Sequence, residues 1–307
     1  MALGRRLAAA MDSDIAYSFR TSPLTVAAAT VVLVLVLGAV FAPLIAPYDP
    51  FDPATLNLMN GFTPPFSANE FTGDYFMLGT DQQGRDLFSA ILYGLRISLF
   101  VGTAAVLFAM VLGVTLGLIA GYAGGLTDTI LMRIADIQLT FPSILLAMLL
   151  SGIGQGLVDP GQRDELAIAV LIVAIGLSDW VQFARVVRSS VLVERSKEYV
   201  AAARLIGRGP VAIMVHHVLP NALSPVLVIA TISLALAVIA EATLSFLGVG
   251  APPTEPSLGT LIRVGQDFMT SGEQWILVFP ACTLLMLALS VNLLGDWLRT
   301  ALNPRLR

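Results

Sequence analysis

The sequence predicts an all-α integral membrane protein with six transmembrane helices and both termini in the cytoplasm. Three observations support this fold class. Of the 307 residues, 56% are hydrophobic and only 12% are charged, against about 25% charged in ordinary soluble domains. Six apolar runs are long enough to cross a bilayer, and Lys and Arg gather in alternate connecting segments. Such a chain has too few polar side chains to face water over its whole surface, so lipid is its natural solvent.

A membrane-spanning helix needs about 20 predominantly apolar residues. The runs that meet this requirement are 25–46, 97–121, 130–153, 166–186, 223–247 and 276–299. The third is the least regular, because Pro142 interrupts it and Arg133 and Asp136 occupy its first turns. These two charged residues are three apart on one helix face, so we expect them to pair. The first run is longer than the apolar core of a signal peptide and is expected to be retained.

The spans divide the rest of the chain into segments with different character. We expect an interfacial or cytoplasmic segment at 1–24, a structured extracytoplasmic loop at 47–96, a loop at 187–222 between spans four and five, and a tail at 301–307. The outer segment 248–275 is expected to contain a short helix that begins after Ser257 as its N-cap. Residues 97–300 form the main transmembrane region.

The placement of basic residues predicts the orientation, because cytoplasmic loops carry the excess of Lys and Arg. With the N-terminus inside, four basic residues lie outside, namely Arg85, Arg96, Arg163 and Arg263. The thirteen inside are Arg5, Arg6, Arg20, Arg133, Arg185, Arg188, Arg195, Lys197, Arg204, Arg208, Arg299, Arg305 and Arg307. The loop 187–222 is therefore expected on the cytoplasmic side.

Several classes of function lack the residues that they need. The net charge of −4 argues against a nucleic-acid partner, and the single cysteine, Cys282, excludes a disulfide framework within the chain. The only histidines, His216 and His217, are adjacent and point to different sides of a helix, which makes a poor metal site. The sequence has no phosphate-binding P-loop, no G-x-S-x-G and no H-E-x-x-H motif. We therefore expect no enzyme activity, no catalytic residue, no metal ligand and no cofactor bound by this chain.

The stretch 198–221, EYVAAARLIGRGPVAIMVHHVLPN, is more structured than a simple connector requires. Helix formers from Glu198 stop at Gly207, which is placed as a C-terminal cap. Gly209-Pro210 restarts the chain, and a second short helix from Val211 is expected to end before Pro220. Two short helices across a small-residue turn make a rigid elbow. The small residues 201–203 are expected to leave one face of this elbow flat for docking against another protein.

Two other groups of residues are candidates for packing or function. Gly113, Gly117 and Gly121 form small-xxx-small steps that let a neighbouring helix approach closely; we expect static packing, with sliding between states as the alternative. Asp179 and Glu241 fall within or near the hydrocarbon, where ionisable groups usually face a cavity or a partner. Structural hydrogen bonding is the alternative for both.

The elbow resembles the "EAA" loop in membrane subunits of type I ABC importers. The family pattern is E-A-A, three residues, Gly, nine residues, and I-x-L-P. The matching positions, with Tyr199 and Arg204 as in the peptide branch, are Tyr199, Ala201, Ala202, Ala203, Arg204, Gly207, His217, Leu219 and Pro220. Ala201 replaces the family's Glu and His217 its Ile, so the resemblance does not extend to a charge contact at position 201.

A second segment is similar to the L-G-T-D-x-x-G-R-D motif of the second, "C-type" permease subunit of dipeptide, oligopeptide and nickel importers. The matching residues are Gly79, Thr80, Asp81, Gly84, Arg85 and Asp86. LSFLGVGAPP and NLLGDWLRTALNPRLR are similar to further hallmarks of that family, and the resemblance runs from about residue 22 to the end.

The resemblance implies the type I permease fold in a bacterial inner membrane and an ATP-driven cycle. The elbow would seat on a cytoplasmic ATPase, a second homologous permease would complete the path, and an extracytoplasmic binding protein would deliver the solute. ATP and Mg would be held by one or two kinds of ATPase subunit. The cargo stays open among dipeptides, oligopeptides, opines, glutathione, sugars and nickel. The alternatives are a self-sufficient secondary transporter or channel, and a membrane scaffold.

Overall fold

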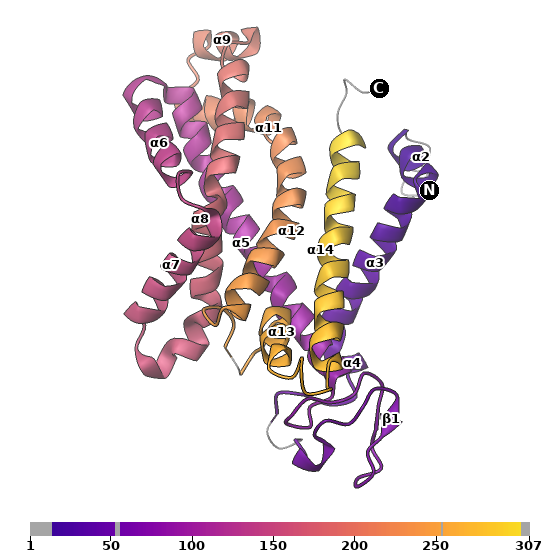
Figure 1. Cartoon of the computed structure of the whole chain (residues 1–307). Coiled ribbons are helices and arrows are strands. Elements are labelled where there is room, and N and C mark those ends of the chain that lie inside the picture. Colours follow the sequence, from indigo (N-terminus) through magenta and orange to yellow (C-terminus); the bar gives the residue numbers. More distant parts are fainter. Residues whose placement is uncertain (1–13, 53–55, 253, 302–307) are drawn as a thin grey trace.

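The computed structural model describes residues 14–52, 56–252 and 254–301 as an elongated helical bundle (Figure 1). Most of segment 1–24 and of the tail 301–307 lies outside these ranges. The chain begins with α2 (Asp14–Thr21), α3 (Pro23–Val40) and α4 (Ala42–Ile45). An outer loop follows with η2 (Leu58–Asn60) and a small hairpin of β1 (Ser67–Ala68) and β2 (Tyr75–Phe76), in which Ser67 pairs with Phe76 and Ala68 with Tyr75.

The bundle itself consists of long helices joined at two ends. It contains α5 (Leu87–Ala123), α6 (Gly125–Gln138), α7 (Ser143–Leu157), η3 (Pro160–Gln162), α8 (Arg163–Glu194), α12 (Ser224–Phe246), α13 (Leu258–Gln266) and α14 (Trp275–Ala301). The elbow contains α9 (Glu198–Leu205), α10 (Pro210–Ile213), the π-helical turn η4 (Met214–Val218) and α11 (Leu219–Ala222). Ser257 caps α13 as expected, its Oγ accepting from the N–H of Thr260.

Five helices in the described ranges, α3, α5, α8, α12 and α14, are long and apolar enough to span a membrane. The pair α6 and α7 makes six spans if it counts as one, but it bends by 93°. The expected third span at 130–153 is therefore not one continuous helix. Pro142 has no N–H to donate and restricts Phe141 before it, so the chain turns at Thr140 and restarts as α7.

The helices α5 and α8 extend beyond the apolar runs 97–121 and 166–186. α5 begins at Leu87, inside the segment expected to be loop, and α8 continues unbroken to Glu194. These extensions carry helix out of the apolar region at both ends of the bundle. The outer loop and the elbow are therefore each mounted directly on a long helix.

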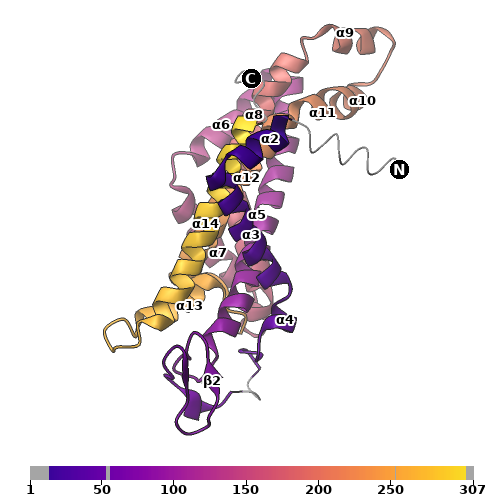
Figure 2. The same cartoon turned by 90° about the vertical axis from the view of Figure 1, so that its right-hand side faces the viewer.

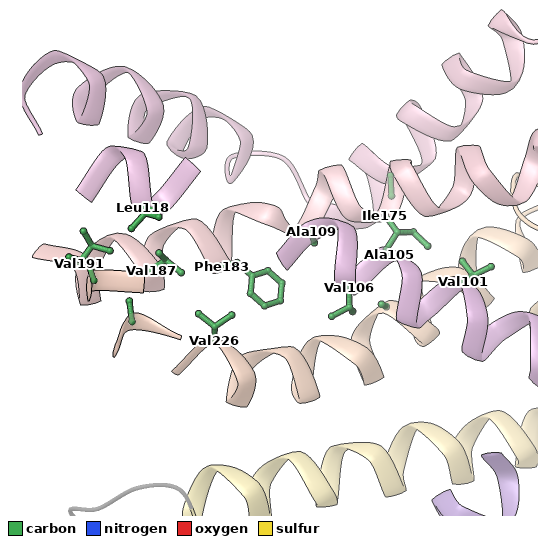
Figure 3. Packing of buried hydrophobic residues seen from close by; sticks show 14 of the residues in the cluster. Val101, Ala105, Val106, Ala109, Leu118, Ile175, Phe183, Val187, Val191 and Val226 are labelled. Carbon is green, nitrogen blue, oxygen red and sulfur yellow. The ribbon is translucent and has the colours of Figure 1, made fainter. Parts of the chain in front are cut away.

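The closest helix crossing joins α5 to α8. Gly113, Gly117 and Gly121 all face α8: a Cβ at Gly113 would lie 2.6 Å from Cβ of Phe183, and one at Gly117 2.9 Å from Cα of Ala184. Side chains larger than hydrogen cannot fit at these distances, so the glycines set the approach of the two helices. Around this crossing a hydrophobic core joins α5, α8, α12 and the elbow (Figure 3).

The ends of the described chain lie at the same end of the bundle as the elbow. Figure 1 shows α2 and the C-terminal end of α14 on the side of α9, with β1, α4 and α13 at the opposite end. Turning the molecule by 90° shows α9 at the extreme tip, with α10 and α11 running back toward the bundle (Figure 2). We call these the elbow end and the outer-loop end.

Ion pairs between helices differ from the expected pairing of Arg133 with Asp136. Asp136 instead binds Arg185 on α8 at 2.5 Å, and Asp128 on α6 binds Arg188, with Nη2 to Oδ2 at 2.6 Å. The crossing of α6 over α8 brings these groups together, although they are about 50 and 60 positions apart in sequence. The expected pair within one helix is therefore wrong.

Candidate functional site: the elbow between α8 and α12

The first half of the elbow is a short helix closed by a glycine cap. At the end of α9 the N–H of Gly207 donates to the carbonyl of Arg204, and the N–H of Arg208 donates to that of Ala203. This pair of bonds is the Schellman motif, in which the residue directly after the C-cap, here Gly207, must have a left-handed backbone. Gly207 meets this requirement with φ +80°, and nothing lies within 4 Å of where its Cβ would be.

The second half does not end before Pro220, so that expectation is wrong. Helical turns continue from Pro210 to Ala222 by way of the π-helical turn η4, in which the N–H of Leu219 donates to Met214, five residues back. A proline ring clashes with the carbonyl four residues before it in an α-helix. The wider π turn lies immediately before Pro220 and moves that carbonyl, on His216, out of the way.

Buried apolar side chains anchor the elbow to the bundle. Val200, Ile213 and Val218 are almost completely buried and belong to the same core as Val187 and Val191 of α8. Ala203 is buried with them, whereas Ala201 and Ala202 are exposed. The expectation that all three alanines form one outward face is therefore wrong, because residues 200 and 203 lie on the same side of α9 and pack inward.

Polar contacts of Tyr199 hold the two halves of the elbow together. Its hydroxyl donates to Oε2 of Glu194 at 2.6 Å and lies 3.4 Å from the carbonyl oxygen of His217. Nδ2 of Asn221 donates to the same carbonyl at 2.8 Å. Burial, and then the neighbouring carboxylate of Glu194, raises the pKa of Tyr199, so the hydroxyl stays protonated at neutral pH and remains a donor.

Two arginines connect the elbow to the end of α5. Nη1 of Arg195 donates to the carbonyl of Gly121 at 2.7 Å, and the guanidinium of Arg204 lies over the ring of Tyr122, 5.6 Å from its centroid. A carbonyl at a helix C-terminus carries partial negative charge that favours a cation. The base of the elbow is therefore fixed to both α5 and α8, the two helices of the closest crossing.

The tip of the elbow exposes large apolar side chains. Leu205 is 88% exposed, Ile206 75% and Val211 66%, and they surround the turn at Gly207. The tip is capped by hydrogen bonds and held by a buried anchor, yet the described part of the chain does not cover its apolar side chains. Exposed apolar groups on a rigid support indicate a surface for another protein.

The second motif caps the other end of α5. Asp86 is the N-cap of α5, with Oδ2 accepting from the N–H of Ser89 at 2.9 Å. Oδ1 of Asp81 accepts from the N–H groups of Gln83 and Arg85 at 2.8 and 3.0 Å. Oγ1 of Thr80 accepts from the N–H of Thr63 at 2.8 Å. This motif is a folded turn that begins the longest helix of the bundle.

The remaining residues of the motif allow this turn to close. Gly79 and Gly84 have φ of +79° and +75°, and a Cβ on Gly84 would run into the backbone carbonyl group of Asn57. Arg85 lies over the ring of Phe51, 5.7 Å from its centroid. Nε1 of Trp275 donates to the carbonyl of Thr80 at 3.2 Å and ties the turn to α14.

The two intramembrane carboxyl groups lie in different environments. Glu241 on α12 is fully buried and accepts from Oγ of Ser245 at 2.7 Å, beside Ser98 and the cap residue Ser257. The carboxyl group lies where α12 meets α5 and α13, and its Oε2 has no hydrogen-bond partner among the described residues. Asp179 on α8 is only partly buried, and within the described ranges it has no hydrogen bond or ion pair. The structure does not bring the two carboxyl groups into one site.

Several residues that build the elbow escaped the sequence analysis. Val200, Ile213 and Val218 carry the anchor, and Leu205 and Ile206 carry the exposed tip. A sequence signal for the exposed tip did exist. Leu205 and Ile206 are two apolar residues immediately before the capping Gly207, at the end of a helix whose water-facing side chains are normally polar. The hydrogen bonds of Glu194 and Arg195 could not be predicted from the sequence, because their partners lie on other elements.

Long apolar helices, together with a structured connector that exposes an apolar tip, define a multi-span membrane protein with a candidate docking surface at the elbow end. The comparisons with known proteins agree with this class. Residues 113–307 match the family model described as binding-protein-dependent transport system inner membrane component. Residues 13–65 match the N-terminal TM domain of oligopeptide transport permease C.

Three curated relatives are similar over most of their length. The di/tripeptide transport system permease protein DppC of Pseudomonas aeruginosa is 37% identical over 276 residues, 90% of this chain and 86% of that protein. The oligopeptide transport system permease protein OppC of Bacillus subtilis is 36% identical, covering 96% of this chain and 90% of that one. The glutathione transport system permease protein GsiD of Pectobacterium atrosepticum is 37% identical, covering 94% and 89%.

A solved structure has the same fold. The MetNI methionine ABC transporter in inward facing conformations aligns with a TM-score of 0.54 and 21% identity, over 69% of this chain and 96% of that one. The chain belongs to the family of binding-protein-dependent transport system inner membrane components, the permease subunits of ABC importers, and is a multi-pass protein of the bacterial inner membrane.

Proposed function

We propose that this chain forms half of an ATP-driven import path for peptides or peptide-like solutes and that its elbow docks on a cytoplasmic ATPase. The observation that carries the docking role is the exposed apolar tip of Leu205, Ile206 and Val211 on a buried anchor. The support for the cargo class is that relatives named for dipeptide, tripeptide and oligopeptide transport are 36–37% identical. A glutathione permease at 37% identity fits the same class, since glutathione is itself peptide-like.

The proposed assembly has four kinds of component. A second, homologous permease completes the path, one or two kinds of ATPase subunit bind ATP and Mg, and an extracytoplasmic binding protein delivers the solute to the outer-loop end. The elbow end, where both ends of the described chain lie, faces the cytoplasm in this arrangement. Thirteen of the seventeen basic residues then lie on the cytoplasmic side, as the positive-inside rule requires.

The elbow suits the coupling of two conformational equilibria. A movement of the ATPases changes the free energy of the permease only through contacts that differ between the two states. The elbow is tied to α8 by Glu194 and Tyr199 and to α5 by Arg195. A displacement of its tip therefore reaches both helices of the closest crossing rather than being lost in a flexible loop.

The test is purification of the tagged protein from its own host in mild detergent, with mass spectrometry of stoichiometric partners. Recovery of a second permease and one or two ATPases is the expected result, and ligand assays on a co-purified binding protein then identify the cargo. A homo-oligomer that transports solute without an ATPase would overturn the proposal in favour of a secondary transporter or channel.

A further inference from the structure

Among the described residues, one charged side chain in α8 has no partner, whereas its charged neighbours on the same helix do. Between residues 166 and 194 the charged residues are Asp179, Arg185, Arg188 and Glu194. Arg185 binds Asp136, Arg188 binds Asp128, and Glu194 binds Lys197 and Tyr199. In the described ranges only Asp179 makes neither an ion pair nor a hydrogen bond.

Asp179 also lies inside the apolar run of α8, where an unpaired charge is costly. Within the run 166–186 it is about 20 Å along the helix from the first residue and about 10 Å from the last, at 1.5 Å per residue. A carboxylate at the bilayer centre costs at least about 2.5 kcal/mol, so such groups pair with a cation or face water-filled space. A structural role would require a partner in this chain, and the described residues provide none.

The side of α8 that carries Asp179 is the side that the rest of the chain leaves open. Residues 179, 182, 186, 189 and 193 follow one another at steps of three or four, and each is partly or fully exposed. On the opposite side, Ala184 is buried against Gly117 of α5. Val187 and Val191 are buried in the core shared with α5 and the elbow (Figure 3). The open stripe begins with Asp179 and Gln182, so its first turn is polar.

The open stripe of α8 continues onto α12. Nε2 of Gln182 donates to Oγ of Ser233 at 3.2 Å across the seam between the two helices. Beside this seam α12 exposes Leu236 and Ile239, again at a step of three. The open stripe of α8 therefore reaches α12 at Gln182 and Ser233, and Asp179 is the one carboxylate among its residues 179, 182, 186, 189 and 193.

We propose that this open stripe lines the import path and that the carboxylate of Asp179 binds the ammonium group of the passing solute. The inference rests on the proposed function, because a single chain supplies half of a path and peptides carry an amino-terminal ammonium group. An unpaired anion in a low-dielectric setting attracts a cation strongly. The neighbouring Gln182 amide lies one turn further along the same stripe, within reach of the polar backbone of a peptide.

A basic side chain of the second permease could satisfy Asp179 in the same way, and the experiment separates the two occupants. The assembled complex is reconstituted in proteoliposomes with its binding protein. Wild type is compared with Asp179→Asn, Asp179→Glu and the matched control Asp164→Asn, which removes an exposed carboxylate from the outer-loop end of the same helix. Two quantities are measured. The first is kcat/KM for uptake of a radiolabelled peptide and, separately, of its N-acetylated form. The second is the Tm of the solute-free complex.

We expect Asp179→Asn to lower kcat/KM for the free peptide at least tenfold with the Tm unchanged, and Asp179→Glu to recover most of the loss. Asp164→Asn should behave as wild type. The preference for the free over the acetylated peptide should shrink at least fivefold in Asp179→Asn. Discrimination by the binding protein is common to both complexes and cancels in this comparison.

Three results would overturn the inference. Uptake by Asp179→Asn within twofold of wild type would show that the carboxylate does not contact the solute. A lower Tm or loss of the second permease would show that Asp179 pairs within the assembly. An unchanged preference for the free peptide would show that the ammonium group is not what Asp179 binds. Failure of the proposed function is distinct, since the wild-type complex would then take up no peptide at all.

Discussion

The elbow and the outer loop are the two structured connectors of this protein, and they are stabilised in opposite ways. The elbow is anchored by buried Val200, Ile213 and Val218 and leaves large apolar side chains exposed at its tip. The outer loop is closed by side-chain-to-backbone bonds from Thr80, Asp81 and Asp86. The outer loop is therefore closed by its own polar contacts, whereas the elbow leaves the large apolar side chains of its tip uncovered.

The difference is clearest at the glycines with left-handed backbones. Gly84 in the outer loop has φ +75° and closes against the backbone of Asn57. Gly207 in the elbow has φ +80° and open space around it. One glycine is needed for both conformation and packing, and the other for conformation alone. The same substitution should therefore harm folding at one end and coupling at the other.

The largest effect is expected for Gly84→Val. A β-branched residue at this φ costs about 1–2 kcal/mol, and the collision with Asn57 adds about 1–3 kcal/mol of overpacking. We expect most of the folded protein to be lost, as measured by size-exclusion chromatography of detergent extracts. Gly73→Val is the matched control, because Gly73 has φ +76° with nothing within 4 Å. Equal yields from the two variants would contradict the packing role.

Gly207→Val should leave insertion and folding intact and abolish coupling. Its cost is conformational only, about 1–2 kcal/mol, and is confined to the turn after α9. Loss of the Schellman bonds frees the tip from its anchor, so we expect ATP-driven uptake in proteoliposomes to fall at least tenfold. Gly209→Val, at φ −66° and also in open space, should retain uptake. Normal uptake by Gly207→Val would remove the distinction between the two connectors.

A smaller effect is expected when one exposed leucine at each end is made polar. Leu205 is 88% exposed in the elbow and Leu58 is 76% exposed in the outer loop. Burying a leucine on a partner contributes about 1.5–3 kcal/mol, so Leu205→Ser should weaken ATPase binding at least about tenfold. Leu58→Ser should not, and neither should change the Tm of the free permease. Binding of purified ATPase measures the contrast, and equal losses would contradict it.

The smallest effect concerns the pH dependence of the outer loop. The pKa of Asp81 is raised, because the effect of burial exceeds the opposite effect of the hydrogen bonds from the backbone N–H groups of Arg85 and Gln83. The folded loop thus favours the protonated carboxyl, and its stability falls as pH rises through the folded pKa. Asp81→Asn keeps the acceptor oxygen without the charge. We expect the Asp81→Asn variant to be slightly more stable than wild type at pH 7. Below a pH of about 3.9, the pKa of Asp in the unfolded chain, the two should be equally stable.

Thermal unfolding across this pH range measures the difference. A variant that is less stable than wild type at neutral pH would show that the charge of Asp81, rather than its acceptor oxygen, stabilises the turn. The elbow should show no change in the same experiment, because no contact of Asp81 reaches it in the described ranges.

The sequence by itself predicted the membrane class, the glycine cap at Gly207 and the N-cap at Ser257. These are local signals: hydrophobic length decides whether a helix suits a bilayer, and a left-handed backbone after a helix selects glycine. The resemblance to importer permeases was likewise carried by short motifs, and the family comparison confirms it.

Only the tertiary structure decided which residues meet. Asp136 pairs with Arg185 rather than Arg133, and Ala203 packs inward rather than facing a partner. The 93° bend between α6 and α7 and the π turn before Pro220 also depend on how the helices cross. The same holds for Asp179. Its charge is visible in the sequence, but only the structure shows that no described residue pairs with it, because that depends on which faces of α8 the other helices cover.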